Sequence, residues 1–150
     1  MAQLHTIDWV QRSAMLGLSI GERANLGAGL GFAAASLLRT NKVDPATPFL
    51  LRGSGGMAKA VAAAFKDSGF LSGTIVARNA TSGRALAHEL GYTWQAEVGS
   101  SRAPLLVNVT PIGMAGAPES TQMAFDTSAI EAAETVFDVV ALPAETPLIQ

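Results

Sequence analysis

The sequence predicts an α/β fold in which helices lie on both faces of a doubly wound, mainly parallel β-sheet. Short apolar runs alternate with helix-forming segments along most of the chain, a pattern typical of successive βαβ units. A glycine-rich turn at residues 53–56 connects the apolar run 49–51 to a strong helix former, residues 57–65. The run at 104–109 is almost entirely apolar, as expected for a strand covered on both faces. These observations predict a Rossmann-like architecture.

The same pattern assigns the individual elements. We expect strands at residues 49–51, 73–77, 92–94, 104–109 and 135–140, and helices at residues 22–40, 57–65, 82–90 and 128–134. Residues 1–21 fit no helical stripe, and the isolated His5 and Trp9 are explained more simply by packing or surface exposure than by a binding site. We therefore divide the chain into an N-terminal helical segment, residues 1–47, and a nucleotide-binding domain, residues 48–150.

Composition excludes several classes of function. With 49% hydrophobic and 15% charged residues, the 150-residue chain is long and apolar enough to form one globular domain. A net charge of −2 with scattered basic residues argues against nucleic acid or a membrane surface as partner. The chain has no cysteine, which excludes disulfides and thiolate chemistry. His5 and His88 lie far apart without a carboxylate cluster, so we expect no metal.

The sequence also bears on location. No run approaches the roughly 18 apolar residues of a membrane span. Residues 1–8 lack the basic start and apolar stretch of a signal peptide. We therefore expect a cytoplasmic protein.

The glycine-rich turn predicts a dinucleotide site. Gly53 permits the tight turn, Gly55 allows close approach of a pyrophosphate, and Ala58 lets the helix pack closely on the strand. The start of the helix then offers unpaired N–H groups to phosphate oxygens. An ordinary tight connection between a strand and a helix is the alternative.

The end of the second predicted strand distinguishes NADP from NAD. An NAD site places an acid there for the ribose 2′-hydroxyl, whereas this segment reads Ala-Arg-Asn-Ala-Thr, residues 77–81. The guanidinium of Arg78 is suited to pair with a 2′-phosphate, and Asn79 to add a neutral hydrogen bond. The sequence therefore favours NADP, the alternative being that Arg78 is simply a solvated charge. Residues 108–114 and 141–148 follow later strands, where ligands of such sheets bind.

Four motifs resemble the shikimate dehydrogenase family, and in particular its shikimate dehydrogenase-like branch. In order along the chain they are residues 53–61, 77–79, 108–114 and 138–148, within a resemblance that covers about residues 48–149. The resemblance implies an NADP-dependent oxidoreductase of aromatic amino acid biosynthesis. It also implies that the pyrophosphate, the 2′-phosphate and the ribose–nicotinamide end are bound by three segments of this chain. The predicted cofactor-binding residues are Gly53, Ser54, Gly55, Gly56, Met57, Arg78, Asn79, Asn108, Thr110, Pro111, Gly113 and Met114.

The resemblance further implies features that this chain lacks. Family members carry a substrate domain ahead of the glycine turn, with a catalytic lysine and an aspartate in an Asn-Thr-Asp segment. Lys42, Lys59 and Lys66 lie outside the family's lysine motif, and residues 25–32 contain no Asn-Thr-Asp. General acid–base catalysis typically contributes roughly 10²–10⁴-fold. We therefore assign no catalytic residue, and expect a partial chain, ending before the family's closing helix, that is inactive toward shikimate or a related hydroxy-cyclohexene carboxylate.

Other interpretations remain open at this point. One is a non-catalytic NADP(H)-binding module that acts through a partner chain, and another is an incomplete gene product. An S-adenosylmethionine enzyme is disfavoured because its ribose also prefers an acid after the second strand. A domain without its neighbour exposes apolar surface, which residues 1–40 cover or which a second copy covers in a homo-oligomer.

Overall fold

The computed structural model describes residues 3–8, 13–19, 28–139 and 147–148. This part of the chain contains seven strands and four helices. In chain order they are β1 (Gln3–Asp8), β2 (Ser13–Ser19), α1 (Ala28–Thr40), β3 (Phe49–Arg52), α2 (Gly56–Asp67), β4 (Gly73–Val76), α3 (Ala80–Leu90), β5 (Thr93–Gln95), β6 (Leu105–Asn108), α4 (Thr127–Ala132) and β7 (Thr135–Asp138).

The strands form one sheet in the order β1-β2-β7-β6-β3-β4-β5. The neighbouring pairs are parallel except for β1 and β2, which are antiparallel. From β3 the chain builds outward through β4 to β5, and then returns to place β6 on the other side of β3. The junction of β3 and β6 is therefore the point at which the strand order reverses, where ligands of such sheets bind.

Strand register brings several loops together at one edge of the sheet. Arg52 at the end of β3 lies opposite Val76 of β4 and Asn108 of β6. Beyond these residues the Gly53 amide donates to the Val76 carbonyl at 2.9 Å, and the Val109 amide donates to the Arg52 carbonyl at 2.8 Å. The loops that follow β3, β4 and β6 consequently begin side by side.

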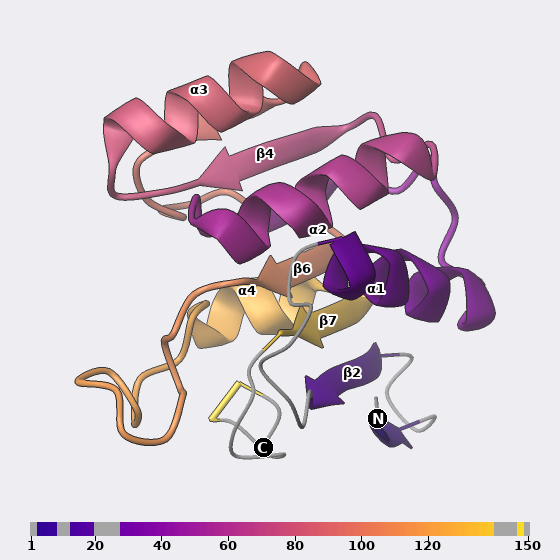
Figure 1. The fold of residues 1–150 in the computed structure, drawn as a ribbon. Coiled ribbons are helices and arrows are strands. Elements are labelled where there is room, and N and C mark those ends of the chain that lie inside the picture. Colours follow the sequence, from indigo (N-terminus) through magenta and orange to yellow (C-terminus); the bar gives the residue numbers. More distant parts are fainter. Residues whose placement is uncertain (1–2, 9–12, 20–27, 140–146, 149–150) are drawn as a thin grey trace.

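Alternating side chains divide the core into two layers. Leu51, Ile75 and Val107 face a cluster that also contains buried residues of α1, α2 and α3. Leu50 and Leu106 face a second cluster with Ala129 of α4 and with residues of the loop that precedes α4. Because successive side chains of a strand point to opposite faces, the helices α1–α3 cover one face and α4 covers the other (Figure 1).

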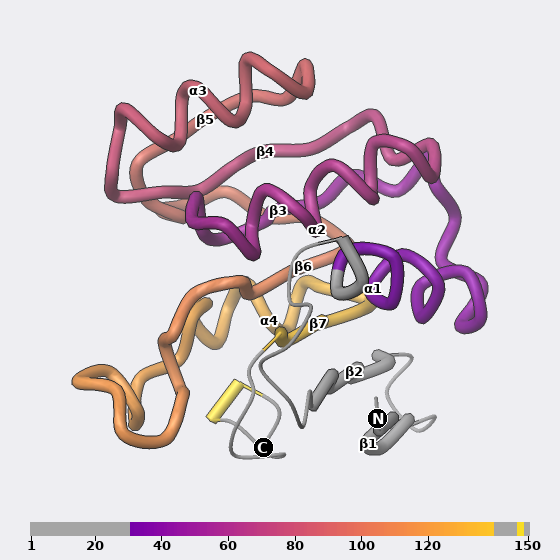
Figure 2. Tube along the Cα trace, viewed as in Figure 1, coloured from indigo at the N-terminus to yellow at the C-terminus, as the bar shows by residue number. Residues whose placement is uncertain are grey.

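Helices α1 and α2 lie against each other on the first face (Figure 1). A Cβ atom at Gly31 of α1 would lie 2.3 Å from the backbone oxygen of Ala60, so the two helix backbones touch at this point. On the other side of the sheet, the connection from β6 to α4 extends away from the strands as a long loop (Figure 2). This loop supplies one wall of the site described below.

The predicted α/β class, with a doubly wound sheet and helices on both faces, is confirmed. The N-terminal part differs from the prediction, because residues 1–47 contain strands β1 and β2 in addition to α1. The expectation of a purely helical segment was therefore wrong. Strand β2 pairs with β7 and extends the sheet, a tertiary contact that local pattern does not reveal. The predicted helix at 22–40 is observed from Ala28, and residues 22–27 lie outside the described residues.

Candidate functional site

A cavity of about 240 Å³ lies at the carboxyl ends of β3, β4 and β6. The loops after all three strands contribute to it, as the strand register requires. It is lined by Arg52, Gly53, Ser54, Val76, Ala77, Arg78, Asn79, Ala96, Thr110, Pro111 and Ile112. Six of the predicted cofactor-binding residues thus meet in one cavity, although up to 58 positions separate them in sequence: they are Gly53, Ser54, Arg78, Asn79, Thr110 and Pro111.

The glycines of the turn differ in what the structure requires of them. Gly53 has a φ of +134°, and a Cβ atom there would lie 2.6 Å from the backbone oxygen of Val109. By contrast, Cβ atoms at Gly55 and Gly56 would meet no atom within 4 Å. Packing within the chain therefore explains the glycine at position 53, whereas the bare backbone at positions 55 and 56 leaves open space beside the start of α2.

The first turn of α2 is available to an anion. Its N-cap residue is Gly55, and no side chain caps the helix. The first N–H groups of a helix have no partner within the helix, and the helix dipole is positive at this end. Open space beside uncapped amides is the arrangement in which a pyrophosphate replaces the missing side-chain cap. The residues present therefore fit the phosphate groups of a dinucleotide.

The next helix along the chain supplies its own cap. Asn79 precedes α3, and its side-chain oxygen accepts a hydrogen bond from the Ser82 amide at 3.1 Å. The Ser82 hydroxyl in turn lies 2.7 Å from the Ser54 hydroxyl in the glycine turn. The two turns are thus joined by a hydrogen bond at the cavity. Asn79 is oriented by this cap, with its side-chain carbonyl already in use.

Two arginines place positive charge at the cavity. Arg78 was predicted, whereas sequence analysis missed Arg52, the last residue of β3, whose guanidinium donates to the carbonyl of Ala124. Both also line an adjoining cavity of about 390 Å³. Burial lowers the pKa of Arg52, and the charge of Arg78 lowers it further, whereas Glu119 and Glu97 act in the opposite direction. An arginine directly before the glycine turn was the available signal, because the last residue of that strand lies at the edge where ligands of such sheets bind.

Arg78 carries an ion pair that the sequence did not predict. Its guanidinium nitrogens lie 3.3 and 3.4 Å from the two carboxylate oxygens of Glu119. Glu119 belongs to the long loop between β6 and α4, 41 positions further along the chain. We expected no acid beside this arginine on the basis of the β4–α3 segment alone. No local sequence signal reveals such a partner.

Asn108, one of the predicted cofactor-binding residues, forms a network of hydrogen bonds within the chain. It is fully buried at the end of β6, and its amide nitrogen donates to the Asp138 carboxylate at 2.9 Å. Its side-chain oxygen accepts from the Thr110 hydroxyl at 2.6 Å and from the Thr110 amide at 3.1 Å. The Ile112 amide donates to the Thr110 hydroxyl at 3.2 Å. Asn108 therefore holds the loop that presents Thr110 to the cavity.

The remaining predicted residues do not line the cavity. Met57 packs against the helical core, and Gly113 is buried, with its amide donating to the Glu119 carbonyl at 2.9 Å. The Met114 amide donates to the Pro111 carbonyl at 2.9 Å, which makes a turn of this segment. Of the predicted loop 141–148, residues 147–148 alone are described, and Leu148 is buried in the second core cluster.

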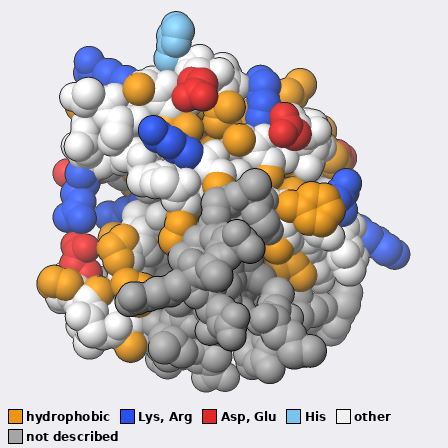
Figure 3. Space-filling view, viewed as in Figure 1, with side chains coloured by type: hydrophobic (Ala, Val, Ile, Leu, Met, Phe, Trp, Pro, Cys, Tyr) orange, Lys and Arg blue, Asp and Glu red, His pale blue; other side chains and the backbone are white. Residues whose placement is uncertain are grey.

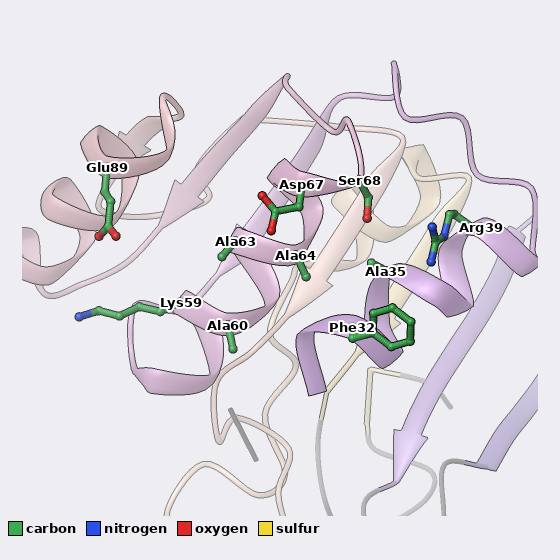
Figure 4. A pocket seen from close by; sticks show the side chains of 10 residues that line it. All are labelled: Phe32, Ala35, Arg39, Lys59, Ala60, Ala63, Ala64, Asp67, Ser68 and Glu89. Carbon is green, nitrogen blue, oxygen red and sulfur yellow. The ribbon is translucent and has the colours of Figure 1, made fainter. Parts of the chain in front are cut away.

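A larger cavity, of about 760 Å³, lies on the helical face of the molecule (Figure 4). Residues of α1 and α2 form most of it, and Glu89 of α3 stands at one side. Phe32 is 67% exposed here, and hydrophobic side chains come to the surface among charged ones over these helices (Figure 3). The lining residues are Phe32, Ala35, Arg39, Lys59, Ala60, Ala63, Ala64, Asp67, Ser68 and Glu89. None of the predicted cofactor-binding residues belongs to this cavity.

Three further observations concern lysines at the cavity, metal ligands and membrane-spanning helices. Neither Lys42, Lys59 nor Lys66 lines the cavity at the strand ends. Within the described ranges, no group of three metal-ligating side chains gathers at one place. In the same part of the chain, no helix combines the length and apolar character needed to cross a bilayer.

The curated relatives of this chain include a shikimate dehydrogenase-like protein and shikimate dehydrogenases. The chain is 50% identical over 101 residues to a shikimate dehydrogenase-like protein from Haemophilus influenzae, a match that covers 67% of this chain and 37% of that protein. It is 36% identical over 126 residues to a shikimate dehydrogenase (NADP(+)) from Acidiphilium cryptum, covering 81% of this chain and 44% of that protein. No family model matches the chain.

Solved structures agree. A shikimate 5-dehydrogenase-like protein superposes with a TM-score of 0.78 at 43% identity, covering 81% of this chain and 45% of the other. A quinate dehydrogenase from Corynebacterium glutamicum superposes with a TM-score of 0.68 at 24% identity, covering 82% and 46%, which supports the fold.

Fold and cavity together define an α/β protein of the Rossmann class, with its candidate site at the reversal of strand order. Over the stretch that it shares with its relatives, the chain belongs to the shikimate dehydrogenase family and corresponds to the C-terminal part of those proteins. It spans less than half the length of the curated relatives that it matches.

Proposed function

We propose that this chain is the NADP-binding domain of a shikimate dehydrogenase-like oxidoreductase. The activity of such a protein is hydride transfer between NADP and shikimate or a related hydroxy-cyclohexene carboxylate. The relative from Acidiphilium cryptum is named a shikimate dehydrogenase (NADP(+)), which supports both the coenzyme and the substrate class.

One observation carries the proposal: an open, uncapped helix start and an exposed arginine share the edge of the sheet where the strand order reverses. The amides at the start of α2 would hold the pyrophosphate, with Gly55 and Gly56 leaving room for it. Arg78, 72% exposed, would pair with the 2′-phosphate of the adenosine. Thr110 and Pro111 line the same cavity and would approach the ribose–nicotinamide end.

The coenzyme, when bound, would accept the hydride in the oxidation or donate it in the reverse reaction, and the residues of this chain would bind and orient it. The Ser54–Ser82 hydrogen bond fixes the two phosphate-facing turns relative to each other. The buried Asn108 network fixes the loop carrying Thr110. Preorganisation of this kind favours binding, because fewer groups lose freedom when the coenzyme arrives.

Calorimetric titration of the chain with NADP⁺ tests the proposal. We expect saturable binding that Arg78→Glu weakens about 100-fold, since a carboxylate replaces a charge-assisted pair with repulsion of the 2′-phosphate. Affinity for NAD⁺, which lacks that phosphate, should change less than about threefold in the same variant. Arg39→Glu on α1 makes the same change of charge outside the cavity and serves as the control. Absence of NADP⁺ binding, or an unchanged Kd in Arg78→Glu, contradicts the proposal.

A second candidate function is a non-catalytic NADP(H)-binding module that acts through a partner chain. The features that carry the first proposal support it as well, because the uncapped start of α2 and Arg78 serve coenzyme binding and require no acid–base pair. The assay is NADP⁺-dependent oxidation of shikimate and of quinate by the purified chain. Robust turnover contradicts the module and shows that the chain holds its own acid–base pair, whereas binding without turnover is expected of both candidates.

A further inference from the structure

The ion pair between Arg78 and Glu119 puts a carboxylate against an arginine that lines the cavity. The Glu119 side chain is 26% exposed, whereas that of Arg78 is 72% exposed, so the acid is the more enclosed partner. Both of its oxygens accept from the guanidinium, at 3.3 and 3.4 Å. An acid is what an NAD site uses to accept a hydrogen bond from the ribose 2′-hydroxyl. Here it is provided by the loop after β6 instead of by the end of β4.

The backbone at Glu119 is anchored by hydrogen bonds within the loop that follows β6. Its carbonyl accepts from the Gly113 amide at 2.9 Å and from the Gln122 amide at 3.1 Å. Gly113 is itself buried, in the segment proposed to approach the nicotinamide end. The carboxylate therefore reaches Arg78 from a backbone held by the site loop, and is not an isolated surface charge that happens to lie nearby.

A 2′-phosphate and this carboxylate require the same donors. A phosphate monoester carries a charge of about −1.5 to −2 at neutral pH. It therefore competes with the Glu119 carboxylate for the guanidinium of Arg78, and the carboxylate repels it. A 2′-hydroxyl carries no charge and is able to donate to the carboxylate. Arg52, the other guanidinium of the cavity, is already engaged with the carbonyl of Ala124. Glu119 thus opposes NADP and tolerates NAD.

We infer that Glu119 is a specificity-determining residue, the counter-ion of Arg78 that lowers the preference of this site for NADP over NAD. The inference rests on the proposed function. It makes the site less selective than Arg78 alone implies, with a nicotinamide dinucleotide of either kind as ligand.

The test is calorimetric titration of wild type and Glu119→Gln with NADP⁺ and with NAD⁺. We expect the ratio of the two dissociation constants, Kd(NAD⁺)/Kd(NADP⁺), to rise about tenfold in the variant, mainly through tighter binding of NADP⁺. Glu97→Gln is the matched control. Glu97 lines the adjoining cavity and raises the pKa of Arg52, but among the described residues it forms no ion pair with Arg78. In Glu97→Gln the ratio of the two dissociation constants should change less than about twofold, because solvent screens the charge of Glu97.

A second background shows whether Glu119 acts through Arg78. In Arg78→Gln, the further change Glu119→Gln should alter the ratio less than about threefold, because the ion pair is already broken. An unchanged ratio in Glu119→Gln, or an equal change in Glu97→Gln or in the Arg78→Gln background, overturns the inference while NADP⁺ binding by wild type leaves the proposed function standing. Failure of wild type to bind either coenzyme overturns both.

Discussion

Two successive strand–turn–helix junctions of this sheet both end in an extended N-cap residue but cap their helices differently. Gly55 before α2 has φ −78° and ψ −172°, and Asn79 before α3 has φ −77° and ψ 101°, so both N-cap residues are extended. The Asn79 side chain accepts a hydrogen bond from the Ser82 amide of α3, whereas Gly55 has no side chain that could accept one from α2. The β4–α3 junction is therefore complete without a ligand, and the β3–α2 junction is not.

The difference shows how the sheet separates structural from binding turns. An N-cap typically contributes about 1 kcal/mol, which the β3–α2 junction forgoes in the free protein. A pyrophosphate at the same amides makes hydrogen bonds of the same kind with a fuller charge. Helix α4 follows the pattern of α3, since the Asp126 carboxylate accepts from the Ala129 amide at 2.7 Å. Of these three helices, α2 alone lacks a side-chain cap, and it follows the glycine turn.

The largest effect on stability is expected at Gly53, which closes the β3–α2 junction. Gly53→Ala combines a strained positive φ with a Cβ atom 2.6 Å from the Val109 carbonyl oxygen, and should cost about 3 kcal/mol of unfolding free energy. Urea unfolding measures the loss. Gly99→Ala is the control, because Gly99 also has a positive φ, of +52°, but open space around its Cβ. It should cost only about 1 kcal/mol. Equal losses in the two variants would show that the contact with Val109 is not what requires glycine.

Two separate variants add a side-chain cap to α2 and remove the side-chain cap of α3. Gly55→Asp gives α2 a side-chain cap and should raise the unfolding free energy by about 0.5 kcal/mol, while weakening NADP⁺ binding about 100-fold by filling and charging the phosphate space. Asn79→Ala removes the cap of α3 and should cost about 1 kcal/mol of stability. Urea unfolding and calorimetry measure the two quantities separately. If Gly55→Asp bound NADP⁺ as tightly as wild type, the start of α2 would not be the phosphate site.

The smallest effect is expected at the cap of α4. Hydrogen bonds from the Ala129 amide and the Ser128 hydroxyl hold the pKa of Asp126 below its ordinary value. A lowered pKa in the folded state stabilises the fold above the unfolded pKa, and this contribution disappears as the pH falls through the folded pKa. The urea midpoint of wild type should therefore exceed that of Asp126→Asn at neutral pH, with a gap that closes below about pH 4. If the difference between the two urea midpoints widened at low pH, the pKa of Asp126 would be raised and not lowered by folding.

Much of the fold was readable from local pattern. The apolar runs, the glycine turn and the helix formers placed five strands and three helices within a few residues of their observed positions, together with the end of α1 at Thr40. The glycine turn and Arg78 also located the candidate site, because the ends of adjacent parallel strands meet at one edge. Strands β1 and β2 escaped notice, since residues 1–19 show neither clean alternation nor a helical stripe, and β2 is a strand of this sheet only because it pairs with β7.

Within the site, sequence determined the residue types and the tertiary structure decided their partners. Residues adjacent in sequence determine both the uncapped start of a helix and the arginine that follows a strand. The amino-acid sequence therefore suffices to predict an anion site. The role of Asn108 as a buried brace and the pairing of Arg78 with Glu119 depend on segments 30 and 41 positions apart. Contacts of that separation follow from the register of β3, β4, β6 and β7, which the packed sheet sets and no local stretch encodes.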